Sequence, residues 1–261
     1  MNYLPALPVA LPLTVAAVLV AGASLLSRRA RDTIAIATSA TVAAICAVLC
    51  YRSLDGPIVY WFGGWTPRDG VALGISFVID PLGAGLAVMS ATLVTASLVF
   101  SWRYFDEIGA LYLALMMIFL GAIAGFCLTG DLFNLFVFFE LMSVSAYALT
   151  GYKIEEQQAL MGAFNFAVTN SIGAFLVLTG LGMLYGRAGA LNLAQLGEAL
   201  VDKPPDALVI VALTLITSGF LVKAAAVPFH FWLADAHAVA PTPVCVLFSG
   251  VMVEAGVYAV A

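Results

Sequence analysis

Charged side chains are scarce in this sequence. They make up 10% of its 261 residues, whereas soluble domains contain about 25%, and apolar residues supply 63%. One water-soluble core cannot hold so many apolar side chains, and the same composition excludes disorder, collagen and small disulfide-linked folds. The formal net charge is −5, so the chain lacks the basic surface that binds nucleic acid, and we expect no nucleic-acid partner.

Motifs for nucleotides, metals and redox cofactors are also missing. The sequence contains neither G-x-x-x-x-G-K-[ST] nor a G-x-G-x-x-G after a strand, and it has no haem-binding C-x-x-C-H. We therefore expect no cofactor, no metal site and no catalysis by this chain itself, so that any ion movement is driven by a gradient or a partner. The four cysteines form no C-x-x-C and are expected to be buried apolar side chains: Cys46, Cys50, Cys127 and Cys245.

Long apolar runs dominate the chain instead. A bilayer core is crossed by about 20 helical residues, and helices satisfy their own backbone polar groups in lipid. The fold class is therefore predicted to be an all-α polytopic membrane protein, with 1–261 forming a single membrane domain. About eight spans are expected, at 7–26, 33–51, 81–101, 108–129, 131–150, 158–185, from near 206 and from near 243.

The same pattern bears on both ends of the chain. The first run has no charge before it and no clear cleavage site, so we expect a retained helix rather than a removed signal peptide. The last run continues to Ala261 without a polar cap, so we expect the chain to be part of a longer protein with further helices.

The longest segment outside the spans is 52–80. Two apolar stretches, 57–62 and 71–77, flank a middle that is rich in glycine, proline and aspartate. This pattern predicts a β-hairpin outside the hydrocarbon region. The segment 186–205 is also polar enough to lie on a membrane surface.

Orientation is predicted from the placement of arginine and lysine. Arg28, Arg29 and Arg31 crowd the short first connection, which should therefore face the cytoplasm. Alternation of the spans then places the N-terminus and the hairpin at 52–80 outside a cell membrane.

Three ionisable residues lie inside apolar runs: Glu140, Lys223 and Glu254. A charge at mid-membrane costs about 2.5–3.5 kcal/mol on insertion scales, so it usually marks a functional site that faces the protein interior or water. Ser143 and Tyr147 follow Glu140 at i+3 and i+7 and share its helix face. This polar stripe predicts a proton relay, and the alternative is a structural ion pair that joins two helices.

Lys223 precedes Pro228 by five residues. Because proline has no N–H, the carbonyl of Ala224 loses its helical partner and the seventh helix is predicted to break there. A broken helix at membrane depth is tolerated where it lines a cavity, so the lysine is a candidate proton-loading group. The alternative is a lysine whose ammonium reaches the membrane interface.

Two histidines follow the break. His230 and His237 are seven residues apart, which places them on one face if the segment is helical, and Asp235 lies between them. Histidine titrates near neutral pH, so the pair could pass protons. Hydrogen-bonded histidines at the membrane interface are an equally weighted alternative, and no third ligand completes a metal site.

A second polar stripe lies on the sixth span. Gln158, Gly162, Asn165 and Thr169 share one helix face. Either the stripe is hydrated, or Asn165 and Thr169 pack by interhelical hydrogen bonding, which is the interpretation that we favour.

Two long motifs resemble one protein family. Residues 130–140 read GDLFNLFVFFE, 223–237 read KAAAVPFHFWLADAH, and 240–244 read APTPV. They are similar to the fifth helix, the broken seventh helix and the start of the eighth helix of antiporter-like subunits. These are the proton-conducting subunits of respiratory complex I, of Mrp-type Na⁺/H⁺ antiporters (the D-type component most closely) and of membrane-bound hydrogenases. The resemblance implies about fourteen helices in two inverted five-helix repeats, of which this chain holds the first.

The resemblance also implies roles for matched positions. Glu140 corresponds to the glutamate that modulates the lysine, and Lys223 to the proton-loading lysine beside the break. His230 and His237 would lie near the connection to the central axis. The sequence departs from the pattern at Glu254, where many relatives carry a lysine or a nearby histidine, and this assigns that step to a carboxyl.

The function expected from these residues and from the resemblance is proton translocation. The chain would serve as a membrane subunit of an NADH dehydrogenase-like, hydrogenase-like or Mrp complex, surrounded by the lipid bilayer and by other membrane subunits. Its complex could be a redox-driven translocase, and Na⁺ exchange is left open. The alternative is a non-conducting scaffold subunit that docks a redox arm.

Overall fold

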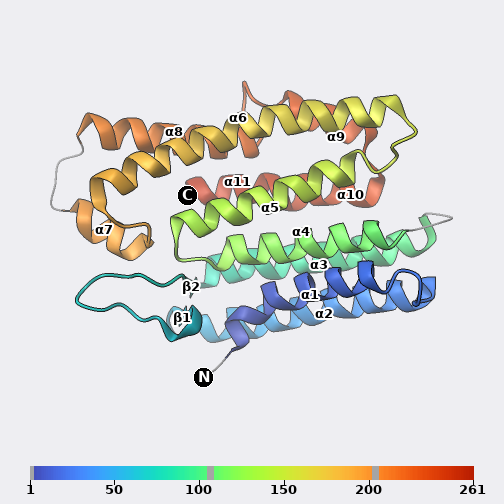
Figure 1. Ribbon diagram of the computed structural model, residues 1–261, viewed down its shortest axis with the longest axis horizontal. Coiled ribbons are helices and arrows are strands. Elements are labelled where there is room, and N and C mark those ends of the chain that lie inside the picture. Colours follow the sequence, from blue (N-terminus) through green and yellow to red (C-terminus); the bar gives the residue numbers. More distant parts are fainter. Residues whose placement is uncertain (1–2, 105–108, 202–205) are drawn as a thin grey trace.

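The computed structural model describes residues 3–104, 109–201 and 206–261. Long helices lie side by side along the longest axis of the molecule (Figure 1). A 3₁₀ turn, Leu4–Ala6, leads into the first of them. The helices are α1 (Leu7–Ala21), α2 (Arg28–Ser53), α3 (Pro81–Tyr104), α4 (Ala110–Leu128), α5 (Leu132–Thr150), α6 (Gln157–Ala188), α7 (Leu193–Val201), α8 (Ala207–Lys223), α9 (Phe231–Val239), α10 (Thr242–Leu247) and α11 (Val253–Val260), with a π-helical segment at Phe248–Met252 between the last two.

The predicted all-α membrane fold is confirmed. Within the described residues, seven helical segments are long and apolar enough to cross a membrane, and α8 is a shorter apolar helix of 17 residues. Each of the eight predicted spans overlaps one of these segments. The bounds differ most at the first connection, where α1 already ends at Ala21 and α2 begins at Arg28. The reason is the cap at Ser27, whose hydroxyl accepts from the N–H of Ala30 at 3.3 Å.

The predicted hairpin is present, with a shifted second strand. Strand β1 (Ile58–Trp61) pairs antiparallel with β2 (Ser76–Ile79). The prediction of a strand at 71–77 is wrong for 71–75, which follow a tight turn as an irregular segment. Asp69 and Gly70 have positive φ angles of 51° and 79°, and Val71 closes this turn by pairing with Arg68.

The hairpin and α7 together hold the start of α5. The N–H of Gly130 donates to the carbonyl of Ser76 at 2.9 Å, and the N–H of Leu193 donates to the carbonyl of Gly130 at 3.0 Å. Asn192 Nδ2 donates to Ser76 Oγ at 3.0 Å. A side chain at Gly130 would overlap Val78, so this close approach requires glycine. The loops at this end therefore fix where α5 begins.

Glycines allow α6 and α8 to lie against each other. Gly219 of α8 meets the backbone of Gly173 and the side chain of Val177, and Gly180 of α6 meets the carbonyl of Ala212. Such small-residue contacts let membrane helices approach closely. The pair brings the C-terminal end of α8 next to the middle of α5 and α6, where the candidate site lies (Figure 1).

Candidate functional site

Lys223 is the last residue of α8 and is completely buried. Its Nζ donates a hydrogen bond to Ser143 Oγ of α5 and lies 4.5 Å from the centre of the Phe139 ring. Asp131 is the N-cap that starts α5, and its Oδ1 accepts from the N–H of Asn134 at 2.8 Å. The ammonium is therefore enclosed by one hydroxyl and one aromatic face.

Glu140 lies one helical turn before Ser143 on α5. Its Oε1 is buried and accepts no hydrogen bond from any described residue. The carboxylate and Lys223 interact electrostatically, but no ion pair within 4.0 Å joins them. The two charges thus influence each other without being neutralised by direct contact.

Tyr147 completes the stripe on α5. Its hydroxyl is buried and has no hydrogen-bond partner among the described residues. Its ring packs edge-on against Phe166 of α6, with centroids 4.7 Å apart. The structure therefore places the four polar residues expected from the sequence, on α5 and α8, in one cluster.

The seventh helix is discontinuous, as predicted, and its ends are held by an aromatic side chain. After Lys223 the chain leaves the helix, with Ala225 at a φ of +50°, and it resumes in α9. A left-handed conformation costs an L-residue about 1–2 kcal/mol. Trp232 Nε1 donates to the carbonyl of Val222 at 2.8 Å, and its ring stacks on Phe166 at 4.4 Å. The indole thus connects both halves of the broken helix to α6.

The two histidines have different surroundings. His230 precedes the first residue of α9 and is exposed, with its ring stacked on Phe231 at 4.4 Å. His237 lies in the last turn of α9, half-buried, and its Nε2 is 2.8 Å from Ser249 Oγ. Ser249 belongs to the π-helical segment, a feature that often occurs at functional sites. The structure therefore does not bring the two histidines together.

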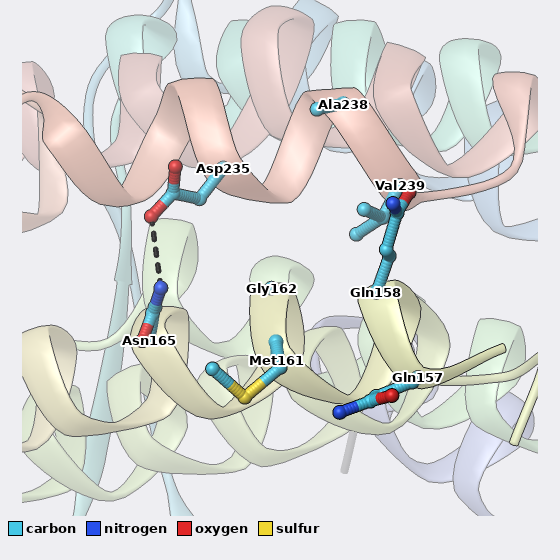
Figure 2. Close-up of a pocket in the computed structure, with 8 residues that line it drawn as sticks. All are labelled: Gln157, Gln158, Met161, Gly162, Asn165, Asp235, Ala238 and Val239. Atoms are coloured by element: carbon cyan, nitrogen blue, oxygen red, sulfur yellow. Dashed lines mark hydrogen bonds between the residues drawn. The ribbon is translucent and has the colours of Figure 1, made fainter.

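A cavity of about 380 Å³ opens between α6 and α9. Figure 2 shows Asp235 of α9 and Asn165 of α6 pointing toward each other, and Asn165 Nδ2 donates to Asp235 Oδ2 at 3.1 Å. This contact agrees with interhelical hydrogen bonding by Asn165. The lining residues are Gln157, Gln158, Met161, Gly162, Asn165, Asp235, Ala238 and Val239.

The sequence matches a known family. Residues 129–261, just over half of the chain, match the family described as "NADH:quinone oxidoreductase/Mrp antiporter, TM". The matched part includes Glu140, Ser143 and Lys223. The chain belongs to this family. The resemblance inferred from the two motifs is thereby confirmed.

Curated members of the family align along nearly the whole chain. NADH-quinone oxidoreductase subunit N of Desulforudis audaxviator is 35% identical, over 98% of this chain and 51% of the relative. The D-type component of a probable K⁺/H⁺ antiporter of Rhizobium meliloti is 32% identical, over 100% of this chain and 48% of the relative. The chain therefore spans about half the length of the curated relatives it matches.

One solved structure contains a chain with the same fold. It is the membrane-bound sulfane sulfur reductase, an archaeal respiratory membrane complex, in which one chain is 30% identical with a TM-score of 0.91. The match covers 99% of this chain and 52% of that one.

Glu254 does not belong to the cluster formed by Glu140, Ser143, Tyr147 and Lys223. It is exposed on α11 and lines a cavity of about 440 Å³ with residues of α3. The structure thus gives it no contact with the other predicted relay residues. Within the described residues, no group of three His, Cys, Asp or Glu side chains could hold a metal ion.

The polar residues of α6 beside the break were missed in the sequence. Asn170 is 1% exposed, and Ser171 is half-buried. Their only sequence signal is that two polar residues follow Thr169 inside an apolar span. That signal does not say which helix they face, because the facing residues come from α5 and α8.

Proposed function

We propose that this chain is a proton-translocating subunit of a multi-subunit membrane complex of the NADH dehydrogenase, hydrogenase or Mrp antiporter type. One observation carries the proposal: the completely buried Lys223 ends a discontinuous helix, contacts a hydroxyl and interacts with the charge of Glu140. Ionisable groups at membrane depth are costly and usually mark ion pathways. The names of the relatives, an NADH-quinone oxidoreductase subunit and a K⁺/H⁺ antiporter subunit, support the same class.

The proposed step is reversible protonation of Lys223 under the control of Glu140. Burial disfavours the charged form of an ionisable group, and a nearby opposite charge favours it. A change in the position or protonation of Glu140 therefore changes how firmly Lys223 holds its proton. Ser143 positions the amine, because its hydroxyl accepts from Lys223 and donates to the carbonyl of Phe139 at 2.7 Å.

The remaining polar residues would carry protons to and from this centre. His237, paired with Ser249, is proposed as a station beyond the break, and Asp235 as a carboxylate at the mouth of the cavity between α6 and α9. His230 and Glu254 are exposed on this chain and would act only where another protein segment or water reaches them. The driving energy would come from partner subunits or from an ion gradient.

The proposed location is the cell membrane, with the N-terminus outside. The arginine cluster at the start of α2 supports this orientation, since Arg28, Arg29 and Arg31 lie in or next to the first turn of a spanning helix. The connection between α5 and α6, which contains Lys153, lies at the same end of the molecule as the start of α2 (Figure 1). The neighbours would be lipid and the other membrane subunits of the complex.

Two variants test the proposal in the assembled complex. Lys223→Ala and Glu140→Ala should each abolish proton translocation in reconstituted vesicles, while the complex assembles at wild-type yield. Assembly is measured by gel filtration of the purified complex, and translocation by a pH-sensitive dye inside the vesicles. Unchanged translocation in both variants would refute the proposal. Loss of assembly without a selective loss of transport would favour a scaffold subunit.

A further inference from the structure

Asn170 is a buried carboxamide in the middle of α6 to which the proposed proton step assigns no role. Its Nδ2 donates to the carbonyl of Phe166 at 3.3 Å, whereas its Oδ1 is buried and has no partner among the described residues. The reverse orientation of the amide would place two oxygens against each other. A buried amide oxygen is nearly always hydrogen-bonded, to protein or to water.

Two contacts show which part of the broken helix lies opposite Asn170. Gly173, three residues further along α6, packs against Val222 in the last turn of α8. Phe166, four residues before Asn170, stacks on Trp232 in the first turn of α9. Residues three and four apart share one face of a helix. Asn170 therefore lies level with the segment that joins α8 to α9.

The joining segment offers further hydrogen-bond acceptors. Among the described residues, no main-chain N–H donates to the carbonyls of Lys223, Ala224 or Ala225. For Ala224 this agrees with the sequence, since Pro228 has no N–H to offer. The amide oxygen of Asn170 and these carbonyls all accept hydrogen bonds, so a ligand that they share must be a donor. Water, with two donors, can bridge an amide oxygen and a carbonyl.

We propose that Asn170 and the carbonyls of the helix break form a water-binding site beside Lys223. This inference rests on the proposed function and names the route by which the proton leaves or reaches the lysine on the side of α9. Asn170 is a positioning residue in this scheme, because it holds the water and does not itself take up the proton. The amide oxygen anchors the water, and the break keeps that water in hydrogen-bond range of the segment that carries Lys223.

The test compares the wild-type complex with three variants of it, all in vesicles. Asn170→Leu removes the amide at similar volume, Asn170→Ser keeps a polar atom that binds water, and Thr179→Val is the matched control. Thr179 lies on the same helix, but it is exposed and donates only to the carbonyl of Phe175. We expect proton translocation to fall about tenfold or more in Asn170→Leu, to recover at least half in Asn170→Ser, and to stay unchanged in Thr179→Val.

Each outcome decides the inference. Wild-type translocation in Asn170→Leu would overturn the water site, and so would a loss that Asn170→Ser does not restore, since that loss is structural. If added Na⁺ restored proton translocation in the Asn170→Leu variant, the water site would also be overturned, because the ligand would then be a cation. If Lys223→Ala abolishes translocation in the same assay, these failures concern Asn170 alone. If Lys223→Ala leaves translocation intact, the proposed function fails first.

Discussion

At the scale of single residues, one hydroxyl holds the buried ammonium. Among the side chains that the structure describes, Ser143 is the one that accepts a hydrogen bond from Lys223, and it lies on a different helix. Ser145, two residues later, is also buried, but its hydroxyl donates only to the carbonyls of its own helix, Leu141 and Met142. The two serines therefore have the same side chain and similar burial, but only Ser143 contacts Lys223.

This difference predicts unequal effects of two alanine substitutions. Ser143→Ala removes a hydrogen bond to a charged group, worth about 1.5–3 kcal/mol, so proton translocation should fall about tenfold or more. Ser145→Ala should leave it within about twofold, since only a bond within the helix is lost. Initial rates of vesicle acidification measure both. Equal rates in the two variants would show that the hydroxyl of Ser143 does not position Lys223.

The residues of the site were predictable to the extent that their charge conflicts with their surroundings. Glu140 and Lys223 stand out because they interrupt apolar runs, and Pro228 marks the broken helix. The contact between Lys223 and Ser143 spans 80 positions, and no local pattern encodes it. The same holds for His237 and Ser249, which are 12 positions apart and lie in different helical segments.

At the scale of helices, the close contact of α6 and α8 positions the site. A methyl group at Gly219 would overlap the carbonyl of Gly173 and the side chain of Val177, whereas a methyl group at Gly182 on α6 would meet nothing within 4 Å. The same glycine-to-alanine change at the two positions therefore separates two effects. At Gly219 it tests the packing of α6 against α8, and at Gly182 it tests helix propensity alone.

Gly219→Ala should destabilise the protein by about 1–3 kcal/mol, because overpacking forces the two helices apart. Gly182→Ala should stabilise it by about 0.5–1 kcal/mol, because alanine is the better helix former. Thermal unfolding of the purified protein in detergent measures both. A Gly219→Ala melting temperature at or above that of wild type would contradict the packing described for α6 and α8.

The start of α8 carries a pH-dependent cap outside the membrane span. Hydrogen bonds from Arg187 and from the N–H of Val209, at 2.7 and 3.0 Å, lower the pKa of Asp206 from its ordinary value of 3.8. A lowered pKa in the folded state means that the carboxylate stabilises the fold above its ordinary pKa. This stabilisation is lost as the pH falls through the lowered value.

The cap predicts a difference between two substitutions of Asp206. Asp206→Asn retains an N-cap but loses the charge, so the gap in melting temperature between wild type and this variant should close as the solution is acidified below pH 4. Asp206→Ala should melt lowest at neutral pH, since it loses both the cap and the ion pair. A gap that widens on acidification would reverse the assigned sign.

Helix existence was more predictable than helix ends and loop structure. Apolar length fixes each span, since the bilayer demands about 20 residues. The second strand of the hairpin begins later than its apolar pattern predicts, because 71–75 is apolar but irregular. Gln195 of α7 contacts this segment and accepts from the N–H of Ala72 at 3.1 Å. That partner lies far along the chain, so strand propensity alone could not reveal it.

At the scale of the whole molecule, the two ends of the helical bundle should face opposite sides of the membrane. The hairpin lies at one end, and the connection between α5 and α6 lies at the other (Figure 1). In a background without the four native cysteines, Thr66→Cys should react with a membrane-impermeant maleimide on intact cells. Glu155→Cys should react only after the membrane is opened. The reverse labelling pattern would invert the proposed orientation.

The account depends most on Lys223 as the group that takes up and releases the proton. The most direct measurement is proton flux through the assembled complex in vesicles, with Lys223→Met compared with Lys153→Met. Lys153 is an exposed lysine that pairs with Glu156 at 3.1 Å, so it controls for the loss of a positive charge. We predict that flux disappears in Lys223→Met and stays at the wild-type level in Lys153→Met. Wild-type flux in Lys223→Met would contradict the account.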